Sequence, residues 1–394
     1  MTQMTPNNQP GRLRSLDIVR GLIMVLMAID HVRVFAGVPA GGATTALFFT
    51  RWVTHFCAPG FVFFAGTSAY LYGKKAGNLP ALSRFLLVRG LWIVLLELIL
   101  MRFAWTFNFD LWNYNLAGVL WMIGWCMVAL AALVRLPVAV VGGLGLLMIV
   151  SHNLLDPQVR SLVQSLADDP LGWIWQVLYF GGSFRIGGSG PRLVILYSLV
   201  PWIGVMAAGY AFGGVMEWPS GRRQRACLII GVSAIAAFVV LRTFNVYGDP
   251  RPWGAPNFPA LFSFLNTNKY PASLLFLLMT LGPLIVLLSL LEHPRGRVAG
   301  ALELFGRVPL FYYVLHIPLI HVLAMGVSIV RTGAISPWLF ENHPMEPPPL
   351  PEGYMWSLWL LYATTVLAVV ILYYACAWFV GYQQRSRSPV ARYF

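Results

Sequence analysis

Charged side chains are scarce in this sequence of 394 residues. They make up only 10% of the chain, and hydrophobic residues make up 58%. A water-soluble domain usually carries about 25% charged residues, because polar groups must cover the surface that faces water. The composition therefore excludes a soluble domain and predicts that lipid surrounds most of the chain.

The sequence also lacks the short motifs of several common kinds of site. The four cysteines, at positions 57, 126, 227 and 376, are far apart, so no disulfide framework is expected. No phosphate-binding loop, nucleophile elbow, zinc-protease motif or paired-cysteine motif occurs, and we expect no metal. The glycine-rich run 187–190 follows no strand pattern and is predicted to be a flexible loop.

Long apolar segments dominate what is present, each close to the roughly 20 residues that a helix needs to cross a bilayer. Ten are expected to cross: residues 16–36, 51–72, 84–105, 116–135, 137–154, 193–214, 226–243, 271–291, 308–330 and 355–381. Segment 171–182 is shorter and is interpreted as interfacial or re-entrant, although it could form an eleventh crossing. The predicted fold is an all-α, polytopic membrane helix bundle.

The distribution of charge predicts the orientation of this bundle. If the N-terminus is cytoplasmic, every cytoplasmic segment carries at least one basic residue, and most carboxylates lie outside. Both termini then face the cytoplasm, with tails 1–15 and 382–394 flanking a membrane domain, 16–381, in the inner (plasma) membrane. The net charge of +13 is spread over short connections, which indicates contacts with the lipid bilayer rather than with nucleic acid.

Ionisable side chains within the apolar segments are the candidate catalytic residues, because burying them in a membrane is costly. Asp30 and His31 lie about fifteen residues into the first segment, roughly 22 Å at 1.5 Å per residue. His55 is expected at a similar depth on the next, antiparallel helix. Two histidines with a carboxylate suit general-base chemistry. The alternatives are that His55 only packs between helices and that Asp30 only neutralises Arg33.

Other charged residues allow both a functional and a structural interpretation. Asp17 and Arg20 are one turn apart at the start of the first helix. They could form an ion pair at the helix entry, or they could be a polar anchor near a cytoplasmic donor site. Glu97 is more readily explained as an interhelical bridge. Of two histidines in the ninth segment, His316 is favoured over His321 as a residue that lines a cavity, because Pro318 loosens the local backbone.

The external loops 155–192, 244–270 and 331–354 are long and rich in Pro, Gly, Trp and Asn, as expected where a substrate site is built. Residues 266–271, Asn-Thr-Asn-Lys-Tyr-Pro, stand at the external mouth of the eighth segment. Pro271 fits the first turn of that helix. Lys269 and Tyr270 could bind an anion or a sugar, or could simply anchor the helix at the interface.

Several stretches resemble the catalytic domain of the heparan-alpha-glucosaminide N-acetyltransferase family. The opening Arg-Leu-Arg-Ser-Leu-Asp-Ile-Val-Arg-Gly, residues 12–21, resembles the start of that domain. Residues 58–68, Ala-Pro-Gly-Phe-Val-Phe-Phe-Ala-Gly-Thr-Ser, are similar to its second helix. Residues 306–316, from Gly-Arg-Val-Pro to Leu315-His316, are similar to a late helix of that domain. Bacterial members of unknown function also resemble residues 201–206 and 269–271.

The resemblance implies transfer of an acyl group from cytoplasmic acetyl-CoA to a sugar on the far side of the membrane. The family uses a histidine in the external loop after its first helix and an Asn at that helix's outer end. Here His31 occupies the position of the Asn, and residues 37–50 contain no histidine. The catalytic role is therefore expected to move to His31 or His55, or to be absent.

The resulting hypothesis is an acyl-CoA-dependent membrane acyltransferase. Its expected catalytic residues are His31, His55 and Asp30. Arg20, Lys74 and Lys75 are expected to bind acyl-CoA, and Asn266, Lys269, Tyr270 and His316 a glycan or small-molecule acceptor. The rivals are a proton-coupled transporter of a small polar molecule, disfavoured by the lack of an internal repeat, and a non-catalytic scaffold. Whether the protein forms a homodimer is left open.

Overall fold

A computed structural model of the protein describes residues 13–42, 44–157, 165, 171–254 and 259–386. Most of the two predicted tails, 1–15 and 382–394, lies outside the described residues, as does Arg12 of the opening motif. The following paragraphs concern the described part of the chain.

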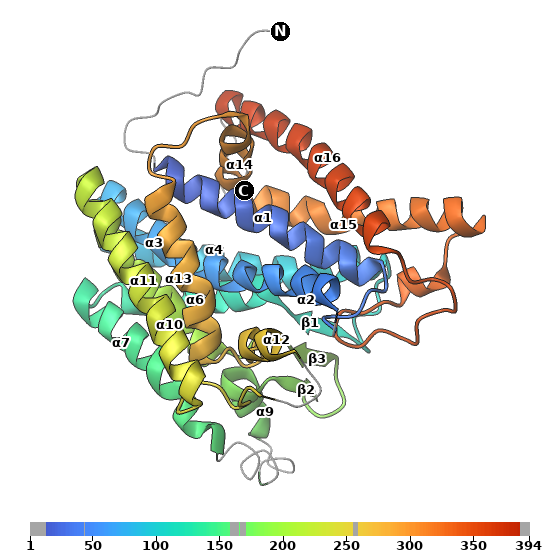
Figure 1. Cartoon of the computed structure of the whole chain (residues 1–394), viewed down its shortest axis with the longest axis horizontal. Coiled ribbons are helices and arrows are strands. Elements are labelled where there is room, and N and C mark those ends of the chain that lie inside the picture. Colours follow the sequence, from blue (N-terminus) through green and yellow to red (C-terminus); the bar gives the residue numbers. More distant parts are fainter. Residues whose placement is uncertain (1–12, 43, 158–164, 166–170, 255–258, 387–394) are drawn as a thin grey trace.

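Helices make up most of the structure and run through it as a bundle (Figure 1). The long ones are α1 (Arg14–Phe35), α3 (Cys57–Ala76), α4 (Leu79–Leu95), α6 (Val119–Leu133), α7 (Val138–Ser151), α10 (Leu199–Met216), α11 (Ser220–Phe244), α13 (Leu274–Leu290), α14 (Arg297–Arg307), α15 (Pro309–Thr332) and α16 (Leu358–Arg385). Each of the ten predicted segments overlaps a helix or a run of consecutive helices.

Five helices are long and apolar enough to cross a membrane: α7 extended to Leu155, α10, α11, α15 and α16. α6 and α13 are apolar but shorter. The multi-pass character of the chain is therefore supported, while ten crossings and cytoplasmic termini stay predictions. The additional helix α14 was not predicted. It packs on α1 near the end of α16 (Figure 1).

Several crossings are built from consecutive helices instead of one. α2 (Thr45–Trp52), the 3₁₀ turn η1 (Val53–Phe56) and α3 follow one another without a break. α4 continues through a π-helical turn, η2 (Leu96–Met101), into α5 (Arg102–Thr106). Such π turns occur often at functional sites, and this one carries the buried Glu97.

The prediction that the fold is all-α was wrong in one respect, because a small three-stranded sheet forms just before α6 and α10. Its strands β1 (Asn115–Ala117), β3 (Arg192–Ile195) and β2 (Gly182–Arg185) lie in that order. β1 pairs with β3 in parallel, Asn115 opposite Leu193, and β2 pairs with β3 antiparallel, Gly182 opposite Ile195. Strands of three or four residues are too short to show an alternating pattern.

Two segment boundaries are corrected by this sheet. The helices begin at Val119 and Leu199, not at 116 and 193, since strand residues come first. The glycine-rich run 187–190 is the turn between β2 and β3.

The helix of the eighth segment, α13, starts later than predicted. Ser273, not Pro271, caps its first turn, because the Ser273 hydroxyl accepts a hydrogen bond from the amide of Phe276. The remaining short elements are η3 (His152–Leu155), α9 (Gly172–Trp175), η4 (Gln176–Phe180), α12 (Ala260–Leu265) and η5 (Pro337–Phe340).

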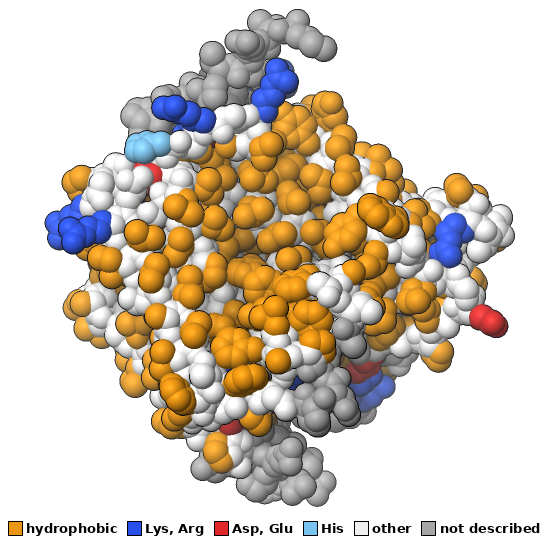
Figure 2. Space-filling model, in the orientation of Figure 1, with side chains coloured by type: hydrophobic (Ala, Val, Ile, Leu, Met, Phe, Trp, Pro, Cys, Tyr) orange, Lys and Arg blue, Asp and Glu red, His pale blue; other side chains and the backbone are white. Residues whose placement is uncertain are grey.

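Close helix packing and an apolar exterior both fit a lipid environment. A Cβ on Gly90 of α4 would lie 2.6 Å from the carbonyl oxygen of Gly124 in α6, so the two backbones touch where only glycine fits. Large apolar side chains such as Val240 and Val366 are exposed. Figure 2 shows such side chains spread across the middle of one face, with most visible charges near its periphery. In water such a surface would aggregate, whereas in a bilayer it faces lipid.

The bundle has two distinct ends. At one, called here the loop end, lie the sheet, α9, α12 and η5 (Figure 1). At the other, called the terminal end, α1 begins and α16 finishes beside α14. If the predicted orientation holds, the terminal end is cytoplasmic.

Candidate functional site

Three adjoining cavities run from the loop end toward the terminal end. The central cavity has a volume of about 510 Å³ and is lined by Asp30, His31 and Glu97, among others. The loop-end cavity, about 490 Å³, is lined by His55 and Asn266. The terminal-end cavity, about 320 Å³, is lined mostly by apolar side chains.

Neighbouring cavities share wall residues. Phe61 and Tyr313 line both the central and the terminal-end cavity. Arg51, Lys269 and Tyr270 line both the central and the loop-end cavity. The central cavity therefore adjoins the other two at these residues.

His31, in the last turns of α1, is paired with a histidine of a distant helix. Its Nδ1 lies 2.6 Å from Nε2 of His316 in α15, and the rings stack with centroids 4.8 Å apart. Trp105 of α5 meets the His31 ring edge-on at 5.1 Å. Three helices therefore fix the orientation of this imidazole in the wall of the central cavity.

Hydrogen bonding assigns the protons of this pair. Nδ1 of His316 faces the carbonyl oxygen of Tyr313, which can only accept, so this nitrogen carries the proton. Nε2 of a neutral His316 is then an acceptor and receives Nδ1–H of His31. The remaining nitrogen of His31, Nε2, keeps its lone pair and has no partner among the described residues. That is the arrangement of an oriented general base.

His316 therefore holds His31 in place and does not itself line any of the three cavities, contrary to the prediction. It is fully buried. His321 is also buried; its Nδ1 donates to the carbonyl oxygen of Ala104 and its ring stacks on Phe107. Five residues of separation on α15 give these two histidines different neighbours.

Asp30 neutralises arginines rather than orienting a histidine. Its Oδ1 accepts from Nε of Arg33 at 3.0 Å, and its Oδ2 accepts from Nη1 of Arg51 at 2.9 Å. The structural alternative offered by the sequence, pairing with Arg33, is thus confirmed, and Arg51 of α2 is an addition. One carboxylate is shared by two cations at the boundary between the central and loop-end cavities.

His55 does not meet His31. No hydrogen bond or ring contact joins them in the described part of the chain. His55 instead donates from Nδ1 to the carbonyl oxygen of Arg51 and packs against Phe276, on the wall of the loop-end cavity. The predicted pairing of His31 with His55, which lies in η1, is therefore replaced by the pairing of His31 in α1 with His316 in α15.

Lys269 and Tyr270 reach the same boundary from the loop before α13. Lys269 is only 7% exposed, and its Nζ lies 5.3 Å from the centre of the Tyr270 ring. The hydroxyl groups of Tyr270 and Tyr197 are 3.5 Å apart. Asn266 is exposed on the wall of the loop-end cavity. These three predicted acceptor residues thus border the cavities near His31.

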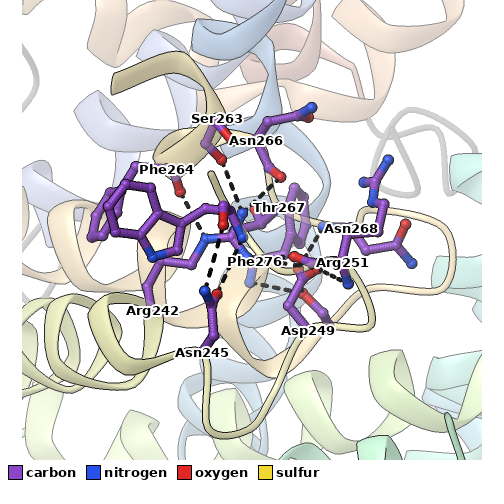
Figure 3. A network of polar contacts seen from close by, with 12 residues as sticks. Arg242, Asn245, Asp249, Arg251, Ser263, Phe264, Asn266, Thr267, Asn268 and Phe276 are labelled. Carbon is purple, nitrogen blue, oxygen red and sulfur yellow. Dashed lines mark hydrogen bonds and ion pairs between the residues drawn. The ribbon is translucent and has the colours of Figure 1, made fainter. Parts of the chain in front are cut away.

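A buried polar network holds this loop in shape (Figure 3). Arg242, at the end of α11, is 1% exposed and donates to the carbonyl oxygens of Arg251, Ser263, Phe264 and Asn266. Asp249, 3.9 Å from Arg242, accepts from the amide of Asn268 and the hydroxyl of Ser273. The segment on both sides of Lys269 is therefore fixed from within.

Of the residues predicted to bind acyl-CoA, Arg20 lines the terminal-end cavity. It donates to the carbonyl oxygen of Phe64 at 2.9 Å, contacts the hydroxyl of Ser68 and forms the expected ion pair with Asp17 at 3.6 Å. Lys74 and Lys75 are exposed at the end of α3, just beyond Tyr72, and line none of the three cavities. Arg89 of α4, which was not predicted, does line the terminal-end cavity.

Glu97 and His343 complete the central cavity. Glu97 accepts a hydrogen bond from the amide of Leu120 at the start of α6, so its interhelical partner is a helix N-terminus, not a basic side chain. His343, in the loop after η5, stacks on Tyr114 at 4.2 Å. Burial, helped by the Arg102 cation, lowers the pKa of His343 from 6.5 to about 4. Nothing in the sequence around His343 marked it as a cavity residue.

Comparison with known proteins gives one match. The family model described as "Heparan-alpha-glucosaminide N-acetyltransferase, catalytic" matches residues 12–244, more than half of the chain. The match includes the opening motif, His31 and His55, whereas Lys269 and His316 lie beyond it. No curated protein matches the chain.

Proposed function

Since the chain belongs to the heparan-alpha-glucosaminide N-acetyltransferase catalytic-domain family, we propose that it moves an acetyl group from cytoplasmic acetyl-CoA to an acceptor outside. The family supports a membrane acyltransferase in general. The donor, the side of the membrane and the acceptor, a glycan or another hydroxyl or amino compound, are our proposal. The observation that carries it is His31 in the wall of a cavity that adjoins one space toward each end of the bundle.

The terminal-end cavity is proposed to receive the donor. Its apolar walls suit the long, largely uncharged arm of coenzyme A, while Arg20 and Arg89 offer positive charge for phosphate groups. Lys74 and Lys75 lie on the adjoining surface, where they can meet the nucleotide end. The thioester then passes between Phe61 and Tyr313 into the central cavity.

At the central cavity Nε2 of His31 accepts the proton of the acceptor's hydroxyl or amino group. The acceptor oxygen or nitrogen attacks the thioester carbonyl, and a carbon–oxygen or carbon–nitrogen bond replaces the carbon–sulfur bond. The thiolate of coenzyme A leaves and takes the proton from His31. His316 is a positioning residue in this scheme, because it keeps the proton of His31 on Nδ1.

The second candidate function is proton-coupled transport. Its specific support is Glu97, which is buried, lines the central cavity and pairs with no basic side chain in the described part of the protein. Such a carboxyl group within a membrane can carry protons. A transporter would move its substrate without releasing coenzyme A.

Binding and turnover of acetyl-CoA test the proposal. Acetyl-CoA should raise the thermal midpoint of the purified wild type, His31→Ala and His55→Ala, because a ligand that binds only the folded state stabilises it. Slow release of coenzyme A should occur with wild type and His55→Ala but not with His31→Ala. If no acyl-CoA stabilises folded wild-type protein, the proposal is wrong and the transporter becomes the better hypothesis.

A further inference from the structure

Positive charge exceeds negative charge where the central and loop-end cavities meet. Arg33, Arg51 and Lys269 line both cavities at this boundary, and Arg251 lines the loop-end cavity. The described carboxylates that line either cavity are Asp30 and Glu97, and Glu97 is engaged with the start of α6. Only Asp30 therefore faces these cations.

Asp30 is already committed on both of its oxygens. Its Oδ1 pairs with Nε of Arg33 at 3.0 Å, and its Oδ2 pairs with Nη1 of Arg51 at 2.9 Å. One negative charge is thus divided between two guanidinium groups, and one positive charge of the arginine pair remains unbalanced. Lys269 adds a second.

Lys269 is buried and forms no ion pair within the described residues, and the carboxylate whose charge acts on it, Asp30, is already paired with two arginines. Within the described ranges no hydrogen bond or ion pair reaches its Nζ, whose nearest recorded neighbour is the Tyr270 ring. An unpaired buried ammonium costs several kcal/mol of effective desolvation free energy. The position is nevertheless fixed: Lys269 pairs with Ala272 through the backbone, and Asp249 holds the amide of the preceding Asn268. A charge held in this way is suited to an anion that arrives from outside.

From this charge imbalance we infer that the acceptor carries an oxyanion, a phosphate or a carboxylate, which Lys269 and Arg51 bind beside His31. The inference rests on the proposed acyl transfer and specifies the chemical class of its acceptor. Arginine presents a planar fork and lysine a point charge, and both bind such oxyanions. The anion would anchor the acceptor at the boundary, so that its hydroxyl or amino group extends to His31 in the central cavity.

Matched ligands with and without the charge test the inference. Glucosamine, glucosamine 6-phosphate, inorganic phosphate and short-chain phosphatidylglycerol are added at constant ionic strength to the full chain in dodecyl maltoside. Thermal stabilisation gives the apparent Kd for wild type, Lys269→Met, Lys269→Arg and Arg251→Gln. Arg185→Gln is the control, because Arg185 is also an exposed arginine at the loop end but lines none of the three cavities.

We expect glucosamine 6-phosphate to bind wild type at least tenfold more tightly than glucosamine, and Lys269→Met to abolish that difference. Lys269→Arg should retain most of the affinity, Arg251→Gln should lose part of it, and Arg185→Gln should match wild type. Stabilisation by phosphatidylglycerol but not by glucosamine 6-phosphate would place the oxyanion on a lipid and overturn a soluble acceptor. If glucosamine 6-phosphate has the same affinity advantage over glucosamine in wild type, Lys269→Met and Arg251→Gln, the proposed oxyanion site is wrong.

Acetyl-CoA separates this inference from the proposed function. It should stabilise Lys269→Met as much as wild type, because Lys269 does not line the terminal-end cavity. Loss of the phosphate effect with retained acetyl-CoA binding supports the oxyanion site. Absence of acetyl-CoA binding in wild type would reject the acyltransferase, whatever the phosphate result.

Discussion

The two ends of α1 carry the same local charge pair in different surroundings. Asp17 pairs with Arg20 and Asp30 pairs with Arg33, each three residues apart on the helix. At the terminal end Arg20 also bonds the backbone of α3 and lines an apolar cavity. At the loop end Asp30 is shared with Arg51, next to Lys269 and the His31–His316 pair.

This difference separates two tasks along one helix. The first pair holds α1 to α3 and places Arg20 on the wall of the proposed donor cavity, which Arg89 of α4 also lines. The second is part of a cluster in which cations exceed carboxylates and a histidine keeps a free lone pair. We therefore expect changes at the loop end of α1 to affect turnover and changes at its terminal end to affect donor binding.

The largest expected effect is that of His31→Ala at the loop end. Removing a general base typically costs 10² to 10⁴ in rate, so the rate of acetyl transfer should fall by about that factor while acetyl-CoA still binds. His316→Phe should cost less, about tenfold to a hundredfold, because an unoriented base remains. The measurement is kcat for coenzyme A release. Weaker binding of acetyl-CoA by His31→Ala or His316→Phe, with kcat unchanged, would contradict the separation of tasks.

A smaller effect is expected from narrowing the boundary between the two cavities. Phe61 and Tyr313 lie between the terminal-end cavity and the central cavity, and Phe61→Trp puts a larger side chain there. The rate of acetyl transfer should fall about tenfold, since misplacing the reacting thioester by 1 Å can cost up to about 10² in rate. Thermal stabilisation by acetyl-CoA and by the acceptor should change little. Phe61→Leu is the control that keeps the boundary open. An unchanged rate for Phe61→Trp would show that the donor takes another path.

Arg20→Gln tests the terminal end of the same helix. Loss of one charged hydrogen bond to a phosphate group is worth about 1.5–3 kcal/mol, so KM for acetyl-CoA should rise about tenfold or more while kcat changes little. Arg20→Lys keeps the charge and should show a smaller rise. A fall in kcat with unchanged KM would place Arg20 in the chemistry and remove the distinction between the two ends.

The smallest expected effect concerns the pH dependence of stability at the loop end. Folding lowers the pKa of His343 to about 4 from 6.5, because burial disfavours its charged form. The unfolded chain therefore binds the proton first, and folded wild type loses stability as the pH falls from about 6.5 to about 4. His343→Gln should remove about 1–2 °C of this fall in the thermal midpoint. Identical pH profiles would show that His343 does not contribute.

Part of this site could be predicted from the sequence because its interactions are local. Asp30 with Arg33, and Asp17 with Arg20, follow from helical spacing alone. The apolar segments followed from composition, and the family resemblance is confirmed over residues 12–244. Lys269 and Tyr270 were identified as binding candidates from their place before an apolar segment, and that role stays a prediction.

The rest depended on contacts between distant segments. His316 is 285 residues from His31, and nothing in the pattern of α15 told which histidine of that helix would meet α1. Arg51 is 21 residues from Asp30, so helical spacing does not predict their ion pair. Arg242 fixes the loop by donating to backbone carbonyls, which every residue has, so its targets leave no trace in the sequence.

Sidedness of the transfer tests the central claim most directly. The protein is reconstituted into vesicles of known orientation, with radiolabelled acetyl-CoA on the side of the terminal end and an amino-sugar acceptor on the other side. The account predicts labelled acceptor on the loop-end side with wild type and none with His31→Ala, while coenzyme A stays on the donor side. Labelling only when donor and acceptor share one side would contradict it.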